Sequence, residues 1–394
     1  SDGVGSIFPP MIYTVVALRC LGYADDAPEM IYALKQLDDL ILEEEGKIRL
    51  QPCVSPVWDT GIALNAVADA LPEATSLQER EALRSSLERG VAWVLTKEVR
   101  RRGDWAVTVP HLQPGGWFFE YNNAFYPDTD DTAMVLMALQ KCRMQNAECR
   151  VTEDIGPAVE RGLHWLLGMQ NDDAGWAAFD RNINRQVLEQ VPFADHNAML
   201  DPSCPDITAR VFESLGYHGF KVGDHRIDRA IDFVRKEQDP CGAWWGRWGV
   251  NYLYGTWQVL QGLQSVGFDM KEPMVRRAVA WLEQVQQAEG SWGETCRSYD
   301  DPALKGQGEP TASQTAWAVL GLIAAGETQS NAVQRGIDYL VRTQQPDGNW
   351  HEAPFTGTGF PKVFYLKYHL YSLYFPLMAL ARYQRAAQAP VHKS

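Results

Sequence analysis

The chain has 394 residues, of which 36 are Lys or Arg and 50 are Asp or Glu, so its formal net charge is −14. Hydrophobic residues make up 45% of it, which excludes a disordered chain, a coiled coil and a collagen-like chain. Nucleic acid is excluded as a partner because phosphate binding needs a clustered basic surface, and the densest basic run, residues 100–102, is short.

The cysteine spacing and the lengths of the apolar stretches indicate the cellular compartment of the protein and whether it binds a metal. No apolar stretch reaches the roughly 18 residues of a membrane-spanning helix, and we expect neither a transmembrane helix nor a signal peptide. The chain starts without Met, so we expect a longer polypeptide around it. Seven cysteines lack the paired spacing of zinc ligands or of a disulfide framework. We therefore expect reduced thiols, a cytosolic compartment and no metal; the cysteines are Cys20, Cys53, Cys142, Cys149, Cys204, Cys241 and Cys296.

One pattern recurs along the chain: a basic residue, a small residue, an aromatic residue, a Gln and then Gly-x-Trp. A loose copy at residues 89–105 has Glu98 in place of the Gln, and a copy at residues 161–176 has Ala174 in place of the Gly. Three copies with identical internal spacing follow at residues 229–244, 277–292 and 335–350. We expect a structural role for these positions: the Trp packs on the neighbouring repeat with its N–H bonded, and the Gln caps free groups of the next helix.

The segments between the motifs predict pairs of helices. Within one copy the apolar residues Ala278, Trp281, Leu282 and Val285 fall at i, i+3, i+4 and i+7. Each copy ends in a turn containing a small residue, and a more apolar helix follows, as at residues 252–266 and 313–325. Strand-like alternation is scarce. The prediction is an all-α fold, a closed or stacked array of helix pairs with amphipathic outer helices and more apolar inner ones.

Three carboxylates crowd into the sequence Asp128-Thr129-Asp130-Asp131, directly before the apolar run 133–139. An acidic residue at this place usually caps a helix, but three acids in four residues exceed what capping needs. Like charges held close cannot all ionise at low cost, so at least one carboxyl should have a raised pKa and keep its proton. Such a group is a candidate Brønsted acid.

Aromatic residues gather in three stretches, residues 115–127, 244–255 and 360–371. In the last of these Phe364, Tyr368 and Tyr371 lie at i, i+4 and i+7, which predicts one helical face. The rings either pack a core or form a cavity wall that stabilises a cation. An acid beside aromatic walls suits protonation of an electron-rich hydrocarbon. A magnesium–diphosphate role of the acids lacks a compensating basic cluster, and no zinc, phosphate-loop or serine-hydrolase motif is present.

Together, these residues resemble the squalene-hopene cyclase branch of the triterpene cyclases. The Gln…Gly-x-Trp copies are similar to that family's QW motifs, residues 128–131 to its DxDD motif, and residues 246–255 and 356–360 to stretches beside its cavity. The resemblance implies an α/α toroid, an α6–α6 barrel, which protonates the terminal alkene of squalene or a similar linear polyprene. It implies cyclisation to hopene or hopanol without a metal or organic cofactor.

The resemblance also implies a set of site residues. Asp130 would donate the proton beside Asp128 and Asp131, and Asp206 and Tyr254 would support it. Arg210 stands where the best-known form of the family has His, and can pair with the acids. Phe8 and Phe179 replace a Gln and a Tyr. The cavity would be lined by Trp58, Phe119, Phe179, Trp248, Phe360, Phe364, Tyr368 and Tyr371, with Ile7, Phe8 and Pro9 at the end where cyclisation terminates.

For domains, the resemblance implies that residues 1–60 form a helical segment leading from an N-terminal barrel domain absent from this chain, and that residues 61–394 form the catalytic barrel. It further implies monotopic association with the cytoplasmic side of a membrane and a homodimer. Two alternatives stay open. An α/α-barrel glycosidase would need two acids about 5 to 9.5 Å apart across a groove, and a non-catalytic helical-repeat scaffold would use the acids only as a cap.

Overall fold

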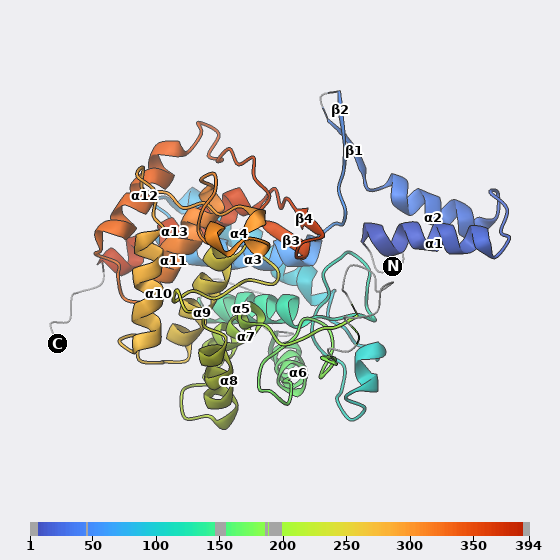
Figure 1. The fold of residues 1–394 in the computed structure, drawn as a ribbon, viewed down its shortest axis with the longest axis horizontal. Coiled ribbons are helices and arrows are strands. Elements are labelled where there is room, and N and C mark those ends of the chain that lie inside the picture. Colours follow the sequence, from blue (N-terminus) through green and yellow to red (C-terminus); the bar gives the residue numbers. More distant parts are fainter. Residues whose placement is uncertain (1–6, 45, 146–154, 186–187, 189–198, 389–394) are drawn as a thin grey trace.

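The computed structural model describes residues 7–44, 46–145, 155–185, 188 and 199–388, and helices dominate them (Figure 1). The helices are α1 (Phe8–Cys20), α2 (Pro28–Asp38), α3 (Pro56–Ala70), α4 (Leu77–Leu95), α5 (Thr129–Met144), α6 (Ile155–Gly168), α7 (Pro205–Tyr217), α8 (His225–Lys236), α9 (Tyr252–Ser265), α10 (Pro273–Gln284), α11 (Ala312–Ala324), α12 (Asn331–Thr343) and α13 (Tyr371–Gln388). Strands β1 (Ile41–Glu44) and β2 (Lys47–Leu50) form one antiparallel hairpin, and β3 (Gly357–Phe360) and β4 (Phe364–Leu366) form another. The all-α prediction is therefore confirmed, with two short hairpins added.

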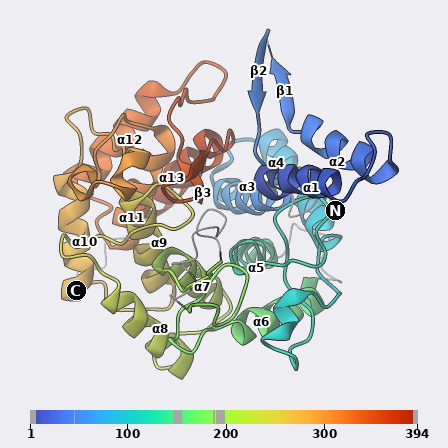
Figure 2. The same ribbon diagram turned by 45° about the vertical axis from the view of Figure 1, so that its right-hand side comes forward.

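Six helices form a closed inner ring. In the order α3, α5, α7, α9, α11 and α13 each helix packs on the next, and α13 packs on α3. Helices α4, α6, α8, α10 and α12 lie outside this ring, as the rotated view shows (Figure 2). The predicted array of helix pairs is thus closed rather than stacked, and it is an α/α toroid.

Burial separates the inner helices from the outer ones as the sequence predicts. In α11 every residue except Ile323 is buried. In α12 the buried residues are confined to one face: Ala332, Val333, Gly336, Ile337 and Leu340. A helix that is apolar all round belongs inside a domain, whereas a single apolar stripe suits a helix with one face in water. The two predicted inner helices are confirmed as α9 and α11.

The repeated motifs hold neighbouring repeats together. The indole N–H groups of Trp176, Trp244, Trp292 and Trp350 each donate to a backbone carbonyl ten residues earlier, at 2.8 Å. The side-chain amide of Gln238 donates to the carbonyls of Gly242 and Met274, both at 2.8 Å. Met274 belongs to the first turn of the next outer helix. The Gln therefore links repeats as expected, but it binds a carbonyl there rather than the free N–H groups of the helix end.

The first repeat differs from the sequence-based alignment. Trp117, and not Trp105, places its indole N–H on the carbonyl of Val94, at 2.7 Å. Trp105 instead meets the ring of Trp165 edge-on. The alignment failed because a longer connection separates α4 from its Gly-x-Trp turn. Glu98, at the Gln position, is bound through both its oxygens by the guanidinium of Arg161, at 2.6 and 2.8 Å.

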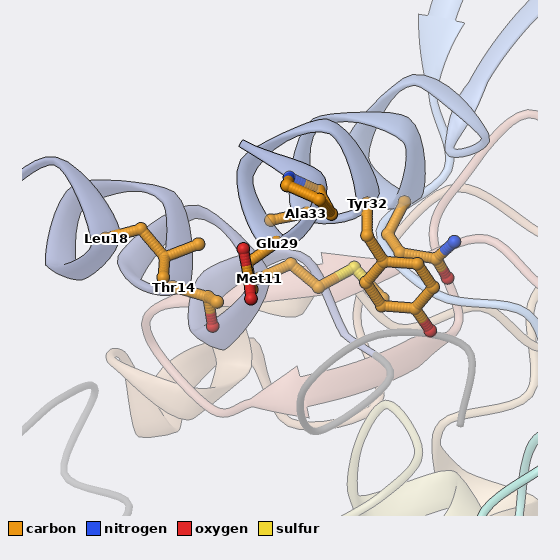
Figure 3. Close-up of a pocket in the computed structure, with 8 residues that line it drawn as sticks. Met11, Thr14, Leu18, Glu29, Tyr32 and Ala33 are labelled. Carbon is orange, nitrogen blue, oxygen red and sulfur yellow. The ribbon is translucent and has the colours of Figure 1, made fainter. Parts of the chain in front are cut away.

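Helices α1 and α2 pack on each other and extend away from the ring (Figure 1). A cavity of about 420 Å³ lies between them, and Figure 3 shows side chains from both helices facing it. The cavity is lined by Met11, Thr14, Leu18, Pro28, Glu29, Tyr32, Ala33 and Gln36, none of which the sequence assigns to the site. Among the described residues, no helix combines the length and apolar character needed to cross a bilayer. The described cysteines are free thiols, and Cys149 lies outside the described residues.

Candidate active site

The N-terminal halves of three inner helices, α5, α7 and α9, meet at one end of the ring. Asp130 of α5, Arg210 of α7 and Tyr254 of α9 contact one another there, although they are far apart in sequence. At the opposite end, Asp69, Lys141 and Arg382 from the C-terminal parts of α3, α5 and α13 also meet. Helix N-termini carry a partial positive charge that favours carboxylates, which makes the first end the natural place for an acid cluster.

The acid triplet divides into a capping pair and one outward-facing member. Asp128 is the N-cap of α5 and accepts the backbone N–H of Asp131 at 2.7 Å. Burial raises the pKa of Asp128 to about 8, and burial together with Asp128 raises the pKa of Asp131 well above its ordinary range. These two neighbours therefore retain a proton at neutral pH. The side chain of Asp130 is 13% exposed, whereas Asp128 and Asp131 are buried.

Asp130 is paired with the buried guanidinium of Arg210. The Nε atom of Arg210 contacts Oδ1 of Asp130, and its Nη2 donates to the hydroxyl of Tyr254 at 2.6 Å. Burial raises the pKa of Asp130 to about 6, and the positive charge of Arg210 works in the opposite direction. The prediction of a raised carboxyl pKa in the triplet is thus confirmed, and Arg210 does pair with it.

Asp206 supports the neighbouring loop rather than touching the acid directly. Its Oδ2 accepts the backbone N–H groups of Arg247 at 2.7 Å and of Trp248 at 3.0 Å. Its charge also raises the pKa of Asp130. Asp206 lies in the first turn of α7, after Pro205, and Pro at the first helical position fits the preset backbone of a helix start.

One group of predicted aromatic residues continues from Arg210. The guanidinium lies 5.0 Å from the ring of Trp58, and the indole N–H of Trp58 donates to the hydroxyl of Tyr371 at 3.0 Å. Tyr371 stacks on Tyr368 with ring centroids 4.5 Å apart. Tyr368 in turn meets Phe119 edge-on at 6.4 Å. These rings form a continuous wall that begins beside the acid.

A second group lies across the loop that Asp206 holds. Phe179 meets Trp248 edge-on, with centroids 5.9 Å apart. The guanidinium of Arg247 lies 4.7 Å from the ring centroid of Trp248 and 5.8 Å from that of Phe360. Phe360 contacts Phe364 at 5.3 Å. The structure therefore brings together the predicted rings in two groups.

The predicted helical face of Phe364, Tyr368 and Tyr371 is wrong. Phe364 begins strand β4, Tyr368 lies between elements, and Tyr371 is the first residue of α13. Gly357, Gly359 and Pro361 precede Phe364, and residues of these types favour a hairpin over a helix. The hairpin needs the glycines, since a side chain at Gly357 would collide with the ring of Tyr368 and one at Gly359 with that of Phe364. Tyr368 and Tyr371 stack on each other, whereas Phe364 contacts Phe360 within the hairpin.

The residues predicted for the terminating end sit beside this hairpin. Ile7 forms an isolated bridge with Cys53, and the backbone N–H of Phe8 donates to the carbonyl of Pro52 at 2.8 Å. A cavity of about 770 Å³ lies there. Its lining residues include Phe8 and Pro9, together with Phe364 and Tyr365 of β4.

Sequence reasoning missed a second layer of rings behind the site. Trp257 and Trp317 stack with centroids 5.8 Å apart and planes within 2° of parallel. Both meet Tyr254 edge-on, and both meet Phe375 edge-on. The signal was available: Trp257 lies at i+3 from Tyr254 on one helix. This layer fixes the ring of Tyr254 in position.

Two family models match the chain. The model of the squalene-hopene cyclase C-terminal domain matches residues 54–385, and that of the squalene-hopene cyclase N-terminal domain matches residues 1–46. The chain belongs to the squalene-hopene cyclase family. The C-terminal domain match contains the inner ring up to residue 385 and the acid cluster, so the candidate site lies within the matched residues.

Named relatives agree with this assignment. The squalene-hopene cyclase of Bradyrhizobium diazoefficiens is 43% identical over 387 residues, which cover 97% of this chain and 57% of that relative. The squalene-hopene cyclase of Alicyclobacillus acidocaldarius is 42% identical over 386 residues, covering 98% and 59%. The chain thus spans less than two thirds of the length of these relatives. The type II terpene cyclase MstE from Scytonema shares the fold, with a TM-score of 0.56, 15% identity, and 96% and 98% of the two chains covered.

Proposed function

We propose that this chain carries the catalytic barrel of a triterpene cyclase, which protonates the terminal alkene of squalene and cyclises it to hopene or hopanol. The observation that carries the proposal is the acid itself. Asp130 is a mostly buried carboxyl whose pKa is raised to about 6, and it pairs with Arg210, whose guanidinium lies over the ring of Trp58. A group of this pKa is both present as the acid and able to give up its proton near neutral pH.

The first step transfers the proton of Asp130 to the less substituted carbon of the terminal alkene. The alkene supplies the electron pair of the new C–H bond, and a tertiary cation forms at the adjacent carbon. The carboxylate that is left is stabilised by Arg210 and by the N-terminus of α5. Successive alkenes then attack the cation, each closing a ring. Loss of a proton ends the series as hopene, and capture of water with loss of a proton ends it as hopanol.

The aromatic wall stabilises the cation as it moves along the folded chain. A cation over a ring gains about 0.5 to 2 kcal/mol, so a single ring is too weak and several must act in succession. Trp58, Tyr371, Tyr368 and Phe119 provide such a series from the acid outward. Phe179, Trp248, Phe360 and Phe364 provide the second series.

The burial of the acids disfavours both alternatives. A glycosidase places two carboxyls on opposite sides of a wet groove, whereas here three carboxyls lie within one helical turn, and Asp128 and Asp131 are 4% and 2% exposed. A non-catalytic helical-repeat scaffold would need these acids only as the N-cap of α5. Asp128 supplies that cap by itself, which leaves the ion pair of Asp130 and Arg210 unexplained by capping.

The proposal extends to partners and domains. The substrate is squalene or a similar linear polyprene, and the protein acts as a homodimer bound monotopically to the cytoplasmic side of a membrane. Exposed apolar side chains on α1 and α2, among them Tyr13, Val16 and Ile31, suit contact with a further apolar surface. The proposal divides the chain into a leading segment, residues 1–60, and the catalytic barrel, residues 61–394. The two family models divide between residues 46 and 54, which supports a leading segment that ends before α3.

Asp130→Asn in the full-length protein tests the function. Asn keeps the size of the side chain but cannot deliver a carboxyl proton, so squalene conversion in detergent should fall at least about 100-fold. Asp232→Asn is the matched control, because Asp232 lies on the outer helix α8 in an exposed ion pair. Products are extracted and identified by mass spectrometry. Conversion by Asp130→Asn at the rate of the control would overturn the proposed mechanism.

A further inference from the structure

The loop of residues 246–249 connects three parts of the candidate site. Its backbone N–H groups at Arg247 and Trp248 bind Asp206. Its Trp248 ring meets Phe179. Gly249 packs flat against Tyr254, and any side chain there would collide with that ring. A displacement of this loop would therefore shift the Trp248 ring, loosen Asp206 and release Tyr254 together.

Tyr299 holds this loop at both ends. It is the last residue of a short 3-10 turn, Cys296–Tyr299, that follows the Gly-x-Trp turn of the next repeat. Its hydroxyl lies 2.5 Å from the carbonyl oxygen of Gly246 and 2.9 Å from that of Gly249. Burial raises the pKa of Tyr299 well above its ordinary range, so the hydroxyl keeps its proton and donates it to one or other carbonyl.

The other side of Tyr299 contacts the second hairpin. Its ring stacks on that of Tyr365 in β4, with centroids 5.9 Å apart. The hydroxyl of Tyr365 donates to the carbonyl of Cys296 at 3.2 Å, within the turn that carries Tyr299. Strand β4 also carries Phe364. The loop itself bonds to β3, where the backbone N–H of Thr358 donates to the carbonyl of Trp248 at 3.4 Å and Gly249 forms a bridge with Gly357. Tyr299 thus stands between the loop and the hairpin, both of which carry rings of the candidate site.

We infer that Tyr299 is a positioning residue that sets how far cyclisation proceeds. The inference rests on the proposed cyclase function. Attraction between a cation and a ring weakens as the two separate, so Trp248 stabilises a passing cation only while its loop is held in place. When the loop is loose, the cation loses a proton to water before the last rings close. The products are then partly cyclised alkenes, formed at the expense of hopene and hopanol.

Tyr299→Phe in the full-length protein tests this role, because Phe keeps the stacked ring and removes only the hydroxyl. Amide hydrogen exchange at residues 246–250 should become about tenfold faster, as loss of one buried hydrogen bond predicts. The partly cyclised share of the products should rise several-fold relative to hopene and hopanol, whether or not the total conversion of squalene falls. Tyr339→Phe on the outer helix α12 is the control, and neither measurement should change in it.

Amide exchange and product analysis together distinguish a failure of the Tyr299 inference from a failure of the proposed cyclase function. Unchanged exchange in Tyr299→Phe would show that the hydroxyl does not hold the loop and would overturn the inference. Faster exchange with an unchanged product ratio would overturn it as well, because the loop would then not set the extent of cyclisation. If the unsubstituted full-length protein leaves squalene unconverted, the proposed function falls and the inference on cyclisation falls with it, while the exchange data alone show whether Tyr299 holds the loop.

Discussion

The guanidinium of Arg210 pairs with the carboxyl of Asp130 across the boundary between α7 and α5. The pair acts on both protonation states of the acid. It stabilises the carboxylate that remains after proton transfer, which makes Asp130 a stronger acid, but it also reduces the fraction of Asp130 that carries a proton. Burial opposes this second effect and leaves the pKa of Asp130 raised to about 6.

The first prediction is the pH dependence of the reaction. The protonated form of Asp130 is the reactive one, and it is lost as the pH rises through its pKa of about 6. Initial rates of squalene conversion should therefore be highest on the acidic side and fall about tenfold per pH unit well above the pKa. Rates measured from pH 5 to 8 check this. A rate that increases from pH 6 to 8 would contradict the assignment of Asp130 as donor.

The second prediction concerns the cation. Arg210→Met removes the positive charge that lowers the pKa of Asp130, so the falling part of the pH–rate profile should move to higher pH. Arg210→Lys retains a charge and should move it less. The position of the profile does not depend on how much of a variant folds, so partial misfolding cannot mimic the shift. A profile of Arg210→Met that stays in place or moves to lower pH would exclude a direct effect of Arg210 on the acid.

These residues also show how far sequence reasoning reaches. The acid cluster was predictable because residues 128–131 combine a helix cap, three crowded carboxylates and a family motif. The repeats were predictable because their internal spacing recurs. The helical face through Phe364 and Tyr371 failed because glycines and a proline upstream favour a hairpin over an equally good helical period. Trp257 and Trp317 were missed because rings in buried helices look alike in sequence, and only the closed ring brings the two helices together.

A third prediction follows from the capping pair. The pKa of Asp128 is raised to about 8 and that of Asp131 well above its ordinary range, whereas unfolding returns both to near 4. The folded state therefore binds more protons than the unfolded state between these pKa values. The contribution of this pair to the free energy of unfolding should be greatest below about pH 4 and decline as the pH rises toward 8. Asp131→Asn, which mimics the protonated acid, should flatten this decline. Thermal unfolding midpoints from pH 5 to 8 check it, with Asp232→Asn as the control, and an unchanged slope would contradict it.

A fourth prediction concerns the Ala of the imperfect repeat. Ala174 has φ of 76°, where the corresponding Gly242, Gly290 and Gly348 have φ of 100°, 93° and 85°. A side chain in this left-handed region costs about 1 to 2 kcal/mol. Ala174→Gly should therefore raise the free energy of unfolding by about 1 kcal/mol. Gly348→Ala is the reciprocal variant, because open space surrounds its Cβ position, and it should destabilise by a similar amount. Denaturant unfolding measures both, and equal stability of Ala174→Gly and wild type would refute the assignment of strain.

The last prediction addresses how the ring closes. Asp69 of α3, the first inner helix, accepts from Arg382 of α13, the last, at 2.8 Å and from Lys141 of α5 at 2.9 Å. Burial raises the pKa of Asp69, but the charges of Arg382 and Lys141 outweigh burial and hold this pKa at about 2. Both partners of the Asp69–Arg382 pair are largely buried, at 6% and 13% side-chain exposure, so the pair joins the two ends of the ring in a place where water cannot replace either charge.

Arg382→Met removes one partner and leaves a buried negative charge with reduced compensation, which typically costs about 3 to 5 kcal/mol. The matched control is Arg276→Met, whose ion pair with Glu327 is 42% exposed on the arginine side and should be worth less than about 1 kcal/mol. Urea unfolding of the three proteins measures this, and equal effects of the two single substitutions would mean that closure of the ring does not depend on the buried pair.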